Sequence, residues 1–460
     1  MSAVRRWTGL TCLLAALLLG TTAATASGVD WGPPGSTTAI GRAGAGGGNV
    51  FRPWVSGDGR YVVFDSDGSR VMGHGPDATR IRDVYLYDRL TGGIERISVA
   101  GDGSRAHIPH CSTPQPCGSQ RPTISTDGRY VAYWSNADNL APGATNDSAN
   151  AYVRDRATNT TILVSPGYQG EQPNGDSRRP VVSRDGRFVV FESDATNLIA
   201  PAECGVLGSK CRRNKAGADN VFVYELATGT LTLVSTAGDG TPGNGVSNRP
   251  SISGDGRKIV FASQATNLVS PATRARQVFL KDLDRGTTTL VSSTADGAEG
   301  DQGSTSPSIS ADGRWVSFDS KAGNFDPADG KGDTDIYVKD LQNGAIEQVS
   351  VRNDGRQATP GKVKGADSSI SADGRFVAFW SDSPDLAPGR RNGTSDIYVR
   401  DRQARTTTRV VSTNGAAGNG NSYSPALSLD GRVVAFDSKA TTLDPAAPGG
   451  GEKVYLHVNY

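Results

Sequence analysis

A five-residue pattern, Ser-x-Asp-Gly-Arg, recurs seven times along the chain and constrains its fold more than any other feature. Successive copies lie 57 to 70 residues apart. Each is followed by two to four β-forming residues, an aromatic residue, one variable residue and a serine. Asp-Gly suits the tight turn of a β-hairpin. The seven repeat turns begin at Asp58, Asp127, Asp185, Asp255, Asp312, Asp373 and Asp430. Repetition at this period predicts an array of equivalent structural units.

Each unit resolves into four predicted strands, as the second repeat shows. Its first strand is expected at residues 121–125, its second at 129–135, its third at 150–155 and its fourth at 160–165. The second strand is apolar on both faces, as a strand between neighbouring sheets would be. Abundant glycine, 58 of 460 residues, suits short strands joined by turns. The sequence therefore predicts an all-β fold, a seven-bladed β-propeller of four-stranded antiparallel blades.

The two ends of the chain predict how the ring closes. The seventh unit has only three strands, the last at residues 453–458. Residues 36–47 resemble residues 286–297, which form a fourth strand and its exit loop. We therefore expect residues 36–43 to complete the last blade, which would leave no open edge between the first and last blades. Residues 27–460 are then a single propeller domain.

The first 26 residues have the features of a secretory signal peptide. Arg5 and Arg6 precede an apolar run, and Ala24 and Ala26 mark a cleavage site with small residues. No later segment is apolar enough to cross a membrane, so we expect a secreted or cell-envelope protein. The 48 basic and 47 acidic residues nearly cancel, which gives no indication of nucleic-acid binding. We expect a monomer without a cofactor.

The repeat also resembles a known family. The pattern S-x-D-G-R-x-V-A-F-x-S, followed by D-I-Y-V-x-D at residues 335–340 and 396–401, is similar to the WD-like repeat of TolB-type propellers. The resemblance covers about residues 36–460 and implies the propeller fold. It does not extend to the α/β domain that precedes the propeller in TolB proteins, or to the hydrolase domain of related peptidases. It therefore implies neither a role in the Tol machinery nor peptidase activity.

Blade topology predicts that the two faces of the ring differ. The turns from first to second strand and from third to fourth strand share one face, which we call the underside, and they are short. The loops from second to third strand and the connections between blades lie on the other face. These are long and variable, so we call it the loop-rich face. Because binding residues gather on loops held by a rigid frame, we expect function there.

Two cysteine pairs fall on the loop-rich face. An even number of closely spaced cysteines in an exported protein predicts disulfides. The predicted pairs are Cys111 with Cys117 and Cys204 with Cys211. Zinc is an alternative near the first pair, beside His107 and His110, but their spacing fits no common zinc pattern. Residues 328–335 resemble a calcium loop only loosely, and a polar loop is the favoured interpretation. We predict no metal site.

Basic clusters on the loop-rich face are candidate binding residues. Guanidinium groups form paired hydrogen bonds with carboxylate or phosphate, so an anionic polymer is a candidate ligand. The candidate ligand-binding residues are Arg178, Arg179, Arg212, Arg213, Arg390 and Arg391. The arginines of the seven repeat turns instead recur with carboxylates at the ends of third strands, which predicts structural pairs on the underside. These carboxylates are Asp88, Asp155, Asp282, Asp340 and Asp401.

Catalytic residues are not indicated by any motif. No Gly-x-Ser-x-Gly sequence occurs, which argues against a serine hydrolase of that type. Carboxylates are plentiful in the loops, so a glycosidase- or lyase-like pair stays open as an alternative. We predict a binding or interaction scaffold for a protein or an anionic cell-surface polymer. An enzyme acting on polysaccharide is the alternative, and a purely structural envelope protein is a third interpretation.

Overall fold

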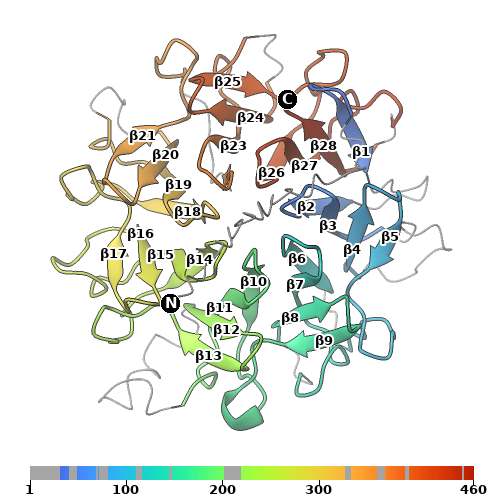
Figure 1. The fold of residues 1–460 in the computed structure, drawn as a ribbon, viewed down its shortest axis with the longest axis vertical. Coiled ribbons are helices and arrows are strands. Elements are labelled where there is room, and N and C mark those ends of the chain that lie inside the picture. Colours follow the sequence, from blue (N-terminus) through green and yellow to red (C-terminus); the bar gives the residue numbers. More distant parts are fainter. Residues whose placement is uncertain are drawn as a thin grey trace, which may run out of the picture.

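The computed structural model describes residues 32–40, 49–68, 71, 81–109, 117–144, 148–200, 219–326, 333–359, 368–388, 393–447 and 450–460. Within these residues, seven four-stranded antiparallel sheets surround a central channel, as Figure 1 shows. The first strand of each repeat lies nearest the channel and the fourth lies at the outer rim. The predicted seven-bladed propeller is confirmed.

The strands of the first four blades follow the repeat closely. Blade one contains β2 (Val50–Val55), β3 (Tyr61–Ser66), β4 (Asp83–Asp88) and β5 (Ile94–Arg96), and blade two contains β6 (Ser119–Ile124), β7 (Tyr130–Ser135), β8 (Asn150–Asp155) and β9 (Thr160–Leu163). Blade three contains β10 (Ser177–Val182), β11 (Phe188–Ser193), β12 (Asn220–Glu225) and β13 (Thr230–Leu233), with a short 3-10 helix, η1 (Tyr168–Gly170), before it. Blade four contains β14 (Ser247–Ile252), β15 (Lys258–Ser263), β16 (Gln277–Asp282) and β17 (Thr288–Leu290).

The last three blades repeat the same order. Blade five contains β18 (Ser304–Ile309), β19 (Trp315–Ser320), β20 (Asp335–Asp340) and β21 (Ile346–Gln348). Blade six contains β22 (Ser369–Ile370), β23 (Phe376–Ser381), β24 (Asp396–Asp401) and β25 (Thr406–Arg409). Blade seven contains β26 (Ser422–Leu427), β27 (Val433–Ser438), β28 (Lys453–Val458) and the N-terminal strand β1 (Thr37–Ile40).

Strand β1 closes the ring, as the sequence predicted. It pairs antiparallel with β28, with Thr37 opposite His457 and Ile40 opposite Val454. The Thr37 hydroxyl lies 2.8 Å from Nδ1 of the buried His457. Burial lowers the pKa of His457 to about 4, so the ring is neutral at physiological pH. The closing strand is confirmed for residues 37–40, and residues 41–43 lie outside the described residues.

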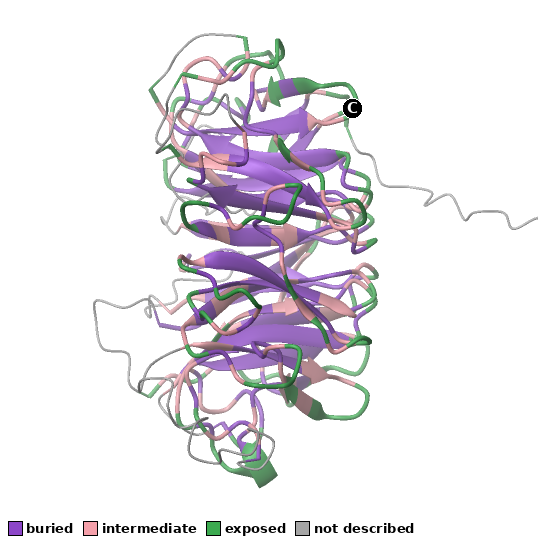
Figure 2. Cartoon of the chain, turned by 90° about the vertical axis from the view of Figure 1, so that its left-hand side faces the viewer, coloured by how far each residue is buried: buried purple, intermediate pink, exposed green. Residues whose placement is uncertain are grey.

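Paired aromatic rings fill the centre of each blade. The repeat aromatic of the second strand stacks on an aromatic residue of the third strand, with ring centroids 5.6 to 6.2 Å apart. The pairs are Phe64–Tyr85, Tyr133–Tyr152, Phe191–Phe222, Phe261–Phe279, Phe318–Tyr337, Phe379–Tyr398 and Phe436–Tyr455. Figure 2 shows that the strands are buried and that exposed residues concentrate in turns at the edges. The repeated aromatic position is therefore a packing position.

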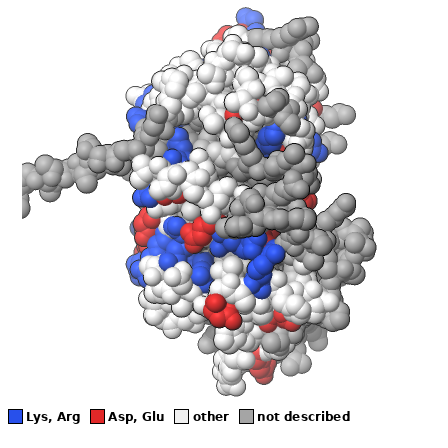
Figure 3. All heavy atoms as spheres, turned by 90° about the vertical axis from the view of Figure 1, so that its right-hand side faces the viewer, with Lys and Arg blue, Asp and Glu red and all other residues white. Residues whose placement is uncertain are grey.

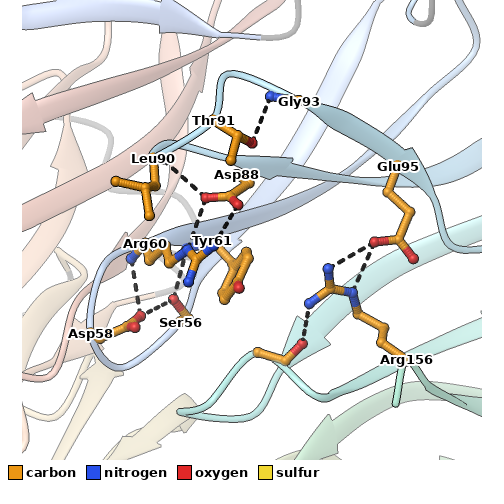
Figure 4. Close-up of polar contacts among 11 residues, drawn as sticks. Ser56, Asp58, Arg60, Tyr61, Asp88, Leu90, Thr91, Gly93, Glu95 and Arg156 are labelled. Atoms are coloured by element: carbon orange, nitrogen blue, oxygen red, sulfur yellow. Dashed lines mark hydrogen bonds and ion pairs between the residues drawn. The ribbon is translucent and has the colours of Figure 1, made fainter. Parts of the chain in front are cut away.

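Each repeat turn is held by its own side chains, as Figure 4 shows for blade one. Ser56 Oγ donates to Asp58 Oδ1 at 2.5 Å and accepts the Tyr61 N–H at 2.9 Å. Asp58 Oδ1 also accepts the Arg60 N–H at 3.0 Å. Gly59 has φ near +71°, a backbone conformation that glycine adopts without steric cost. These bonds explain why serine, aspartate and glycine recur together.

The arginine of the repeat turn also pairs with a carboxylate at the end of the third strand, on the underside of the same blade. We call this pair a brace. Arg60 makes two hydrogen bonds to Asp88, at 3.0 and 2.7 Å, and this contact lowers the pKa of Asp88. Equivalent pairs join Arg129 to Asp155, Arg314 to Asp340 and Arg375 to Asp401. The prediction is wrong for Asp282, which bonds to Arg285 of its own turn, while Arg257 lies 3.5 Å from Asp284. In blade four, Arg285 in the turn after the third strand pairs with Asp282 at 2.7 Å and takes the place of the repeat-turn arginine.

Neighbouring blades are joined by a ring placed over a glycine. A Cβ added to Gly128 would lie 2.3 Å from the Tyr61 ring of the preceding blade. Arg60 and Arg156 lie 4.6 and 4.9 Å from the centroid of that ring, and Arg156 also bonds to Glu95 at 2.8 Å. Figure 3 faces the side of blades one and two and shows basic groups interleaved with acidic ones. The ion pair between Arg156 and Glu95 joins blade two to blade one.

Candidate functional site

A cavity of about 150 Å³ lies at the centre of the ring and is lined by the first strands. Four arginines from four consecutive blades line it. They are Arg52, Arg121, Arg179 and Arg249, which we call the channel arginines. The described residues that line the cavity include no carboxylate. Each channel arginine is the third residue of its six-residue strand, so the four lie at the same level of the channel.

A β-bulge turns each channel arginine toward the cavity. The pairing of β2 with β3 shifts between Phe51 and Trp54, and the same shift occurs in β6, β10 and β14. The residue at the bulge precedes a proline and has positive φ: Arg52 at 48°, Arg121 at 51°, Arg179 at 50°, Arg249 at 53°, Ser306 at 50° and Ser424 at 51°. A positive φ is costly for any residue with a Cβ. Strained backbone of this kind gathers at functional sites.

Buried carboxylates accept hydrogen bonds from the backbone N–H groups of the residues at the bulges. Asp65 Oδ1 accepts the Arg121 N–H at 3.2 Å, and Glu192 Oε2 accepts the Arg249 N–H at 2.8 Å. Asp437 makes the equivalent contact with the Arg52 N–H at 3.3 Å. These acids occupy the variable position of the repeat, between the aromatic residue and the serine. They fix the bulge backbone while the arginine side chains face the cavity.

Burial also changes the charge of these carboxylates. It raises the pKa of Asp65 to about 6, although Arg52 and Arg82 both act to lower it. The pKa of Asp437 is raised by burial and by the neighbouring Glu452. Arg82 Nη1 lies 3.2 Å from Asp65 Oδ2, and its guanidinium stacks 4.0 Å from the Phe51 ring centroid. The positive charge of the cavity therefore increases as the pH falls through about 6.

The cavity is polarised across the ring. Blades one to four contribute the channel arginines, whereas blades five to seven contribute serines: Ser306, Ser308, Ser368 and Ser424. Trp54 adds an aromatic surface, and six prolines add apolar surface. Arginines bind anionic groups, and serine hydroxyls donate and accept hydrogen bonds. This arrangement suits a small ligand that has an acidic group on one side and hydroxyl groups on the other.

The predicted binding residues divide into three groups. Arg179 lines the cavity, with Nε 3.0 Å from Glu192 Oε1. Arg178 is exposed at the rim and pairs with Asp176 at 2.5 Å, so it is not directed into the cavity. The remaining predicted residues, Arg212, Arg213, Arg390 and Arg391, lie outside the described residues.

Sequence reasoning missed Arg52, Arg121 and Arg249. The signal was the recurrence of Arg-Pro in four first strands, in the sequences FRPWVS, QRPTIS, RRPVVS and NRPSIS. Most of the predicted binding residues came from the long loops, whereas these three arginines lie in short strands.

The predicted disulfides and metal alternatives stay predictions. Cys111, Cys204 and Cys211 lie outside the described residues, as do residues 328–332 of the loop weighed for calcium. His107 is exposed and lies 2.9 Å from Asp138. Within the described part of the chain, no three residues of the metal-binding types His, Cys, Asp or Glu gather closely enough to hold an ion.

Comparison with known proteins identifies fold relatives. No family model matches the chain. A probable dipeptidyl-peptidase 5 of Emericella nidulans is 28% identical over 141 residues, which is 30% of this chain but only 17% of that protein. An oligogalacturonate lyase solved with manganese is 15% identical, with a TM-score of 0.52 over 89% of this chain and 90% of that chain. TolB from Acinetobacter baumannii is 14% identical, with a TM-score of 0.41 over 83% of this chain and 67% of that chain.

These comparisons concern the fold. The structural neighbours include TolB-type propellers. They also include oligogalacturonate lyase. Among the described residues, no helix combines the length and apolar character needed to span a bilayer.

Proposed function

We propose that this protein binds an anionic ligand through the channel arginines, as a secreted or cell-envelope binding protein. The observation that carries the proposal is the convergence of four arginines on one cavity whose described lining residues include no carboxylate. Cations in a partly enclosed site attract anions more strongly than the same charges on an open surface. An anionic glycan fits this cavity better than a protein partner does, because about 150 Å³ accepts a small chemical group rather than a protein surface.

The test compares binding of oligogalacturonate to the purified protein and to a variant carrying Arg121→Gln and Arg249→Gln. Oligogalacturonate is chosen because every ring carries a carboxylate beside hydroxyl groups. Each hydrogen bond to a charged group contributes roughly 1.5–3 kcal/mol. Loss of two arginines should therefore weaken binding by about a hundredfold or more, as measured by calorimetric titration.

Arg285→Gln is the matched control. Arg285 carries the same charge but lies on the underside, where its side chain is 74% exposed. This variant should bind like the parent protein. Equal affinity for parent and double variant would show that the channel arginines are not the binding site. Cleavage of the oligomer during incubation would instead support the alternative enzymatic function.

A further inference from the structure

The repeat turns surround the underside end of the channel. One residue in each turn lies between the serine and the aspartate, and we call these the tip residues. They are Gly57, Thr126, Arg184, Gly254, Ala311, Ala372 and Leu429. Backbone hydrogen bonds connect the tips of adjacent blades. The Gly254 N–H donates to the Ala311 carbonyl at 2.9 Å, and the Ala372 N–H donates to the Leu429 carbonyl at 2.8 Å.

Similar contacts continue around the ring. The Thr126 N–H donates to the Arg184 carbonyl at 3.0 Å, and the Leu429 N–H donates to the Gly57 carbonyl at 3.1 Å. A Cβ added to Gly57 would lie 2.6 Å from Leu429 Cδ1 and 2.7 Å from Thr126 Cγ2. The tips of blades seven, one and two are therefore packed so closely that a methyl group does not fit. The underside opening of the channel is a constriction.

The side chain of Arg184 crosses this constriction. It starts at the tip of blade three and reaches blade one, where Nη1 lies 3.4 Å from the Val55 carbonyl oxygen. Its guanidinium carbon lies 6.0 Å from the centroid of the Trp54 ring, which lines the cavity. Burial lowers the pKa of Arg184 to about 10, so the side chain is still protonated at neutral pH. Among the described residues, no carboxylate forms an ion pair with it.

We propose that the cavity is a blind pocket that binds the terminal acidic ring of a polyuronate, or the free sugar acid, and excludes internal segments of the chain. This inference rests on the proposed function and specifies its ligand. A chain bound by an internal ring needs two exits, and the tip residues with Arg184 block the underside exit. The cavity volume of about 150 Å³, which in another protein holds benzene, leaves room for no more than one sugar ring. The arginine side receives the carboxylate, and the serine side receives the hydroxyl groups.

The number of protein molecules bound per chain tests this inference. Calorimetric titrations would use a trimer and a dodecamer of galacturonate with the purified protein. Recognition of chain ends predicts the same number of protein molecules per chain for both lengths. Recognition of internal rings predicts more protein molecules on the dodecamer, and that result would overturn the inference. Binding of neither oligomer would instead refute the proposed function itself.

Competition by the monomer distinguishes a free sugar acid from a chain end. Galacturonate should displace the bound trimer, because a single ring fills the pocket, and failure to displace it would contradict the one-ring pocket. The affinities of the monomer and the trimer then indicate whether the natural ligand is a free sugar acid or a chain end, because a free-acid site binds the monomer at least as tightly as the trimer. Arg184→Gln should weaken trimer binding several-fold without changing the stoichiometry, whereas Arg285→Gln should change neither. An unchanged affinity in Arg184→Gln would show that the cation below Trp54 does not act on the ligand.

Discussion

The close contact between Tyr61 and Gly128, which joins blades one and two, allows us to predict how much a substitution at Gly128 lowers the free energy of unfolding. Gly128 has φ near +72°, and an added Cβ would lie 2.3 Å from the Tyr61 ring. Gly286 is a matched control, because its φ is near +68° but nothing lies within 4 Å of its Cβ position. The substitution Gly128→Ala therefore introduces backbone strain and a clash, whereas Gly286→Ala introduces only the strain.

The two costs can be separated. A left-handed alanine costs about 1–2 kcal/mol, partly offset by about 0.4–1 kcal/mol from the lower entropy of the unfolded chain. Both variants share this part, so it cancels in the difference. Displacement of the packed ring adds about 1–3 kcal/mol in Gly128→Ala alone. The free energy of unfolding should therefore be lower in Gly128→Ala than in Gly286→Ala by about that amount.

Urea denaturation followed by tryptophan fluorescence measures this difference, since the chain has six tryptophans. A double variant, Tyr61→Ala with Gly128→Ala, should recover part of the loss, because the ring that clashes is then absent. Equal stability of Gly128→Ala and Gly286→Ala would show that the Tyr61 ring does not clash with the added methyl group. A double variant in which the losses of the two single substitutions simply add would show the same.

Three further predictions concern ionisation, ring closure and the braces. Burial raises the pKa of Asp65 from 3.8 to about 6, so the folded chain binds more protons than the unfolded chain between those pH values and loses stability as the pH rises through them. Asp65→Asn should remove this loss, about 3 kcal/mol at most, and a pH series of urea midpoints with the same slope as the parent would contradict it. Thr37→Val should destabilise the closing strand by about 1–3 kcal/mol, because His457 loses its buried hydrogen bond, while Thr38→Val, on the exposed side of the same strand, should not. Differential scanning calorimetry measures both, and equal melting temperatures would argue against the closure. Arg314→Gln should lower the melting temperature more than Arg257→Gln, because Arg314 makes two hydrogen bonds to Asp340, at 3.1 and 2.7 Å, whereas Arg257 lies 3.5 Å from an exposed Asp284. The reverse order would contradict the brace.

The repeating frame was predictable from the sequence because its causes are local. Ser56, Asp58 and Gly59 act within one turn, and the same residues recur in every blade. The aromatic residue stacks on an aromatic residue in the adjacent strand of its own blade. The closing strand was visible because the last unit lacked a fourth strand.

The binding site was harder to predict because it depends on contacts between blades. Arg121 faces the cavity only because of a bulge, and the backbone of that bulge is held by Asp65 of the preceding blade. Proline favours an extended conformation in the residue before it, so the positive φ of Arg121 contradicts the local expectation. Arg178, adjacent in sequence to Arg179, was given equal weight but pairs with Asp176 at the rim. Sequence spacing alone does not distinguish the two.

A crystal structure of the protein with bound trigalacturonate would show directly whether the channel arginines bind the ligand. We expect one terminal ring in the channel, with its carboxylate within hydrogen-bond distance of at least two of the four channel arginines and with the rest of the chain leaving through the loop-rich face. A ligand bound only on outer loops, with the channel arginines untouched, would contradict it.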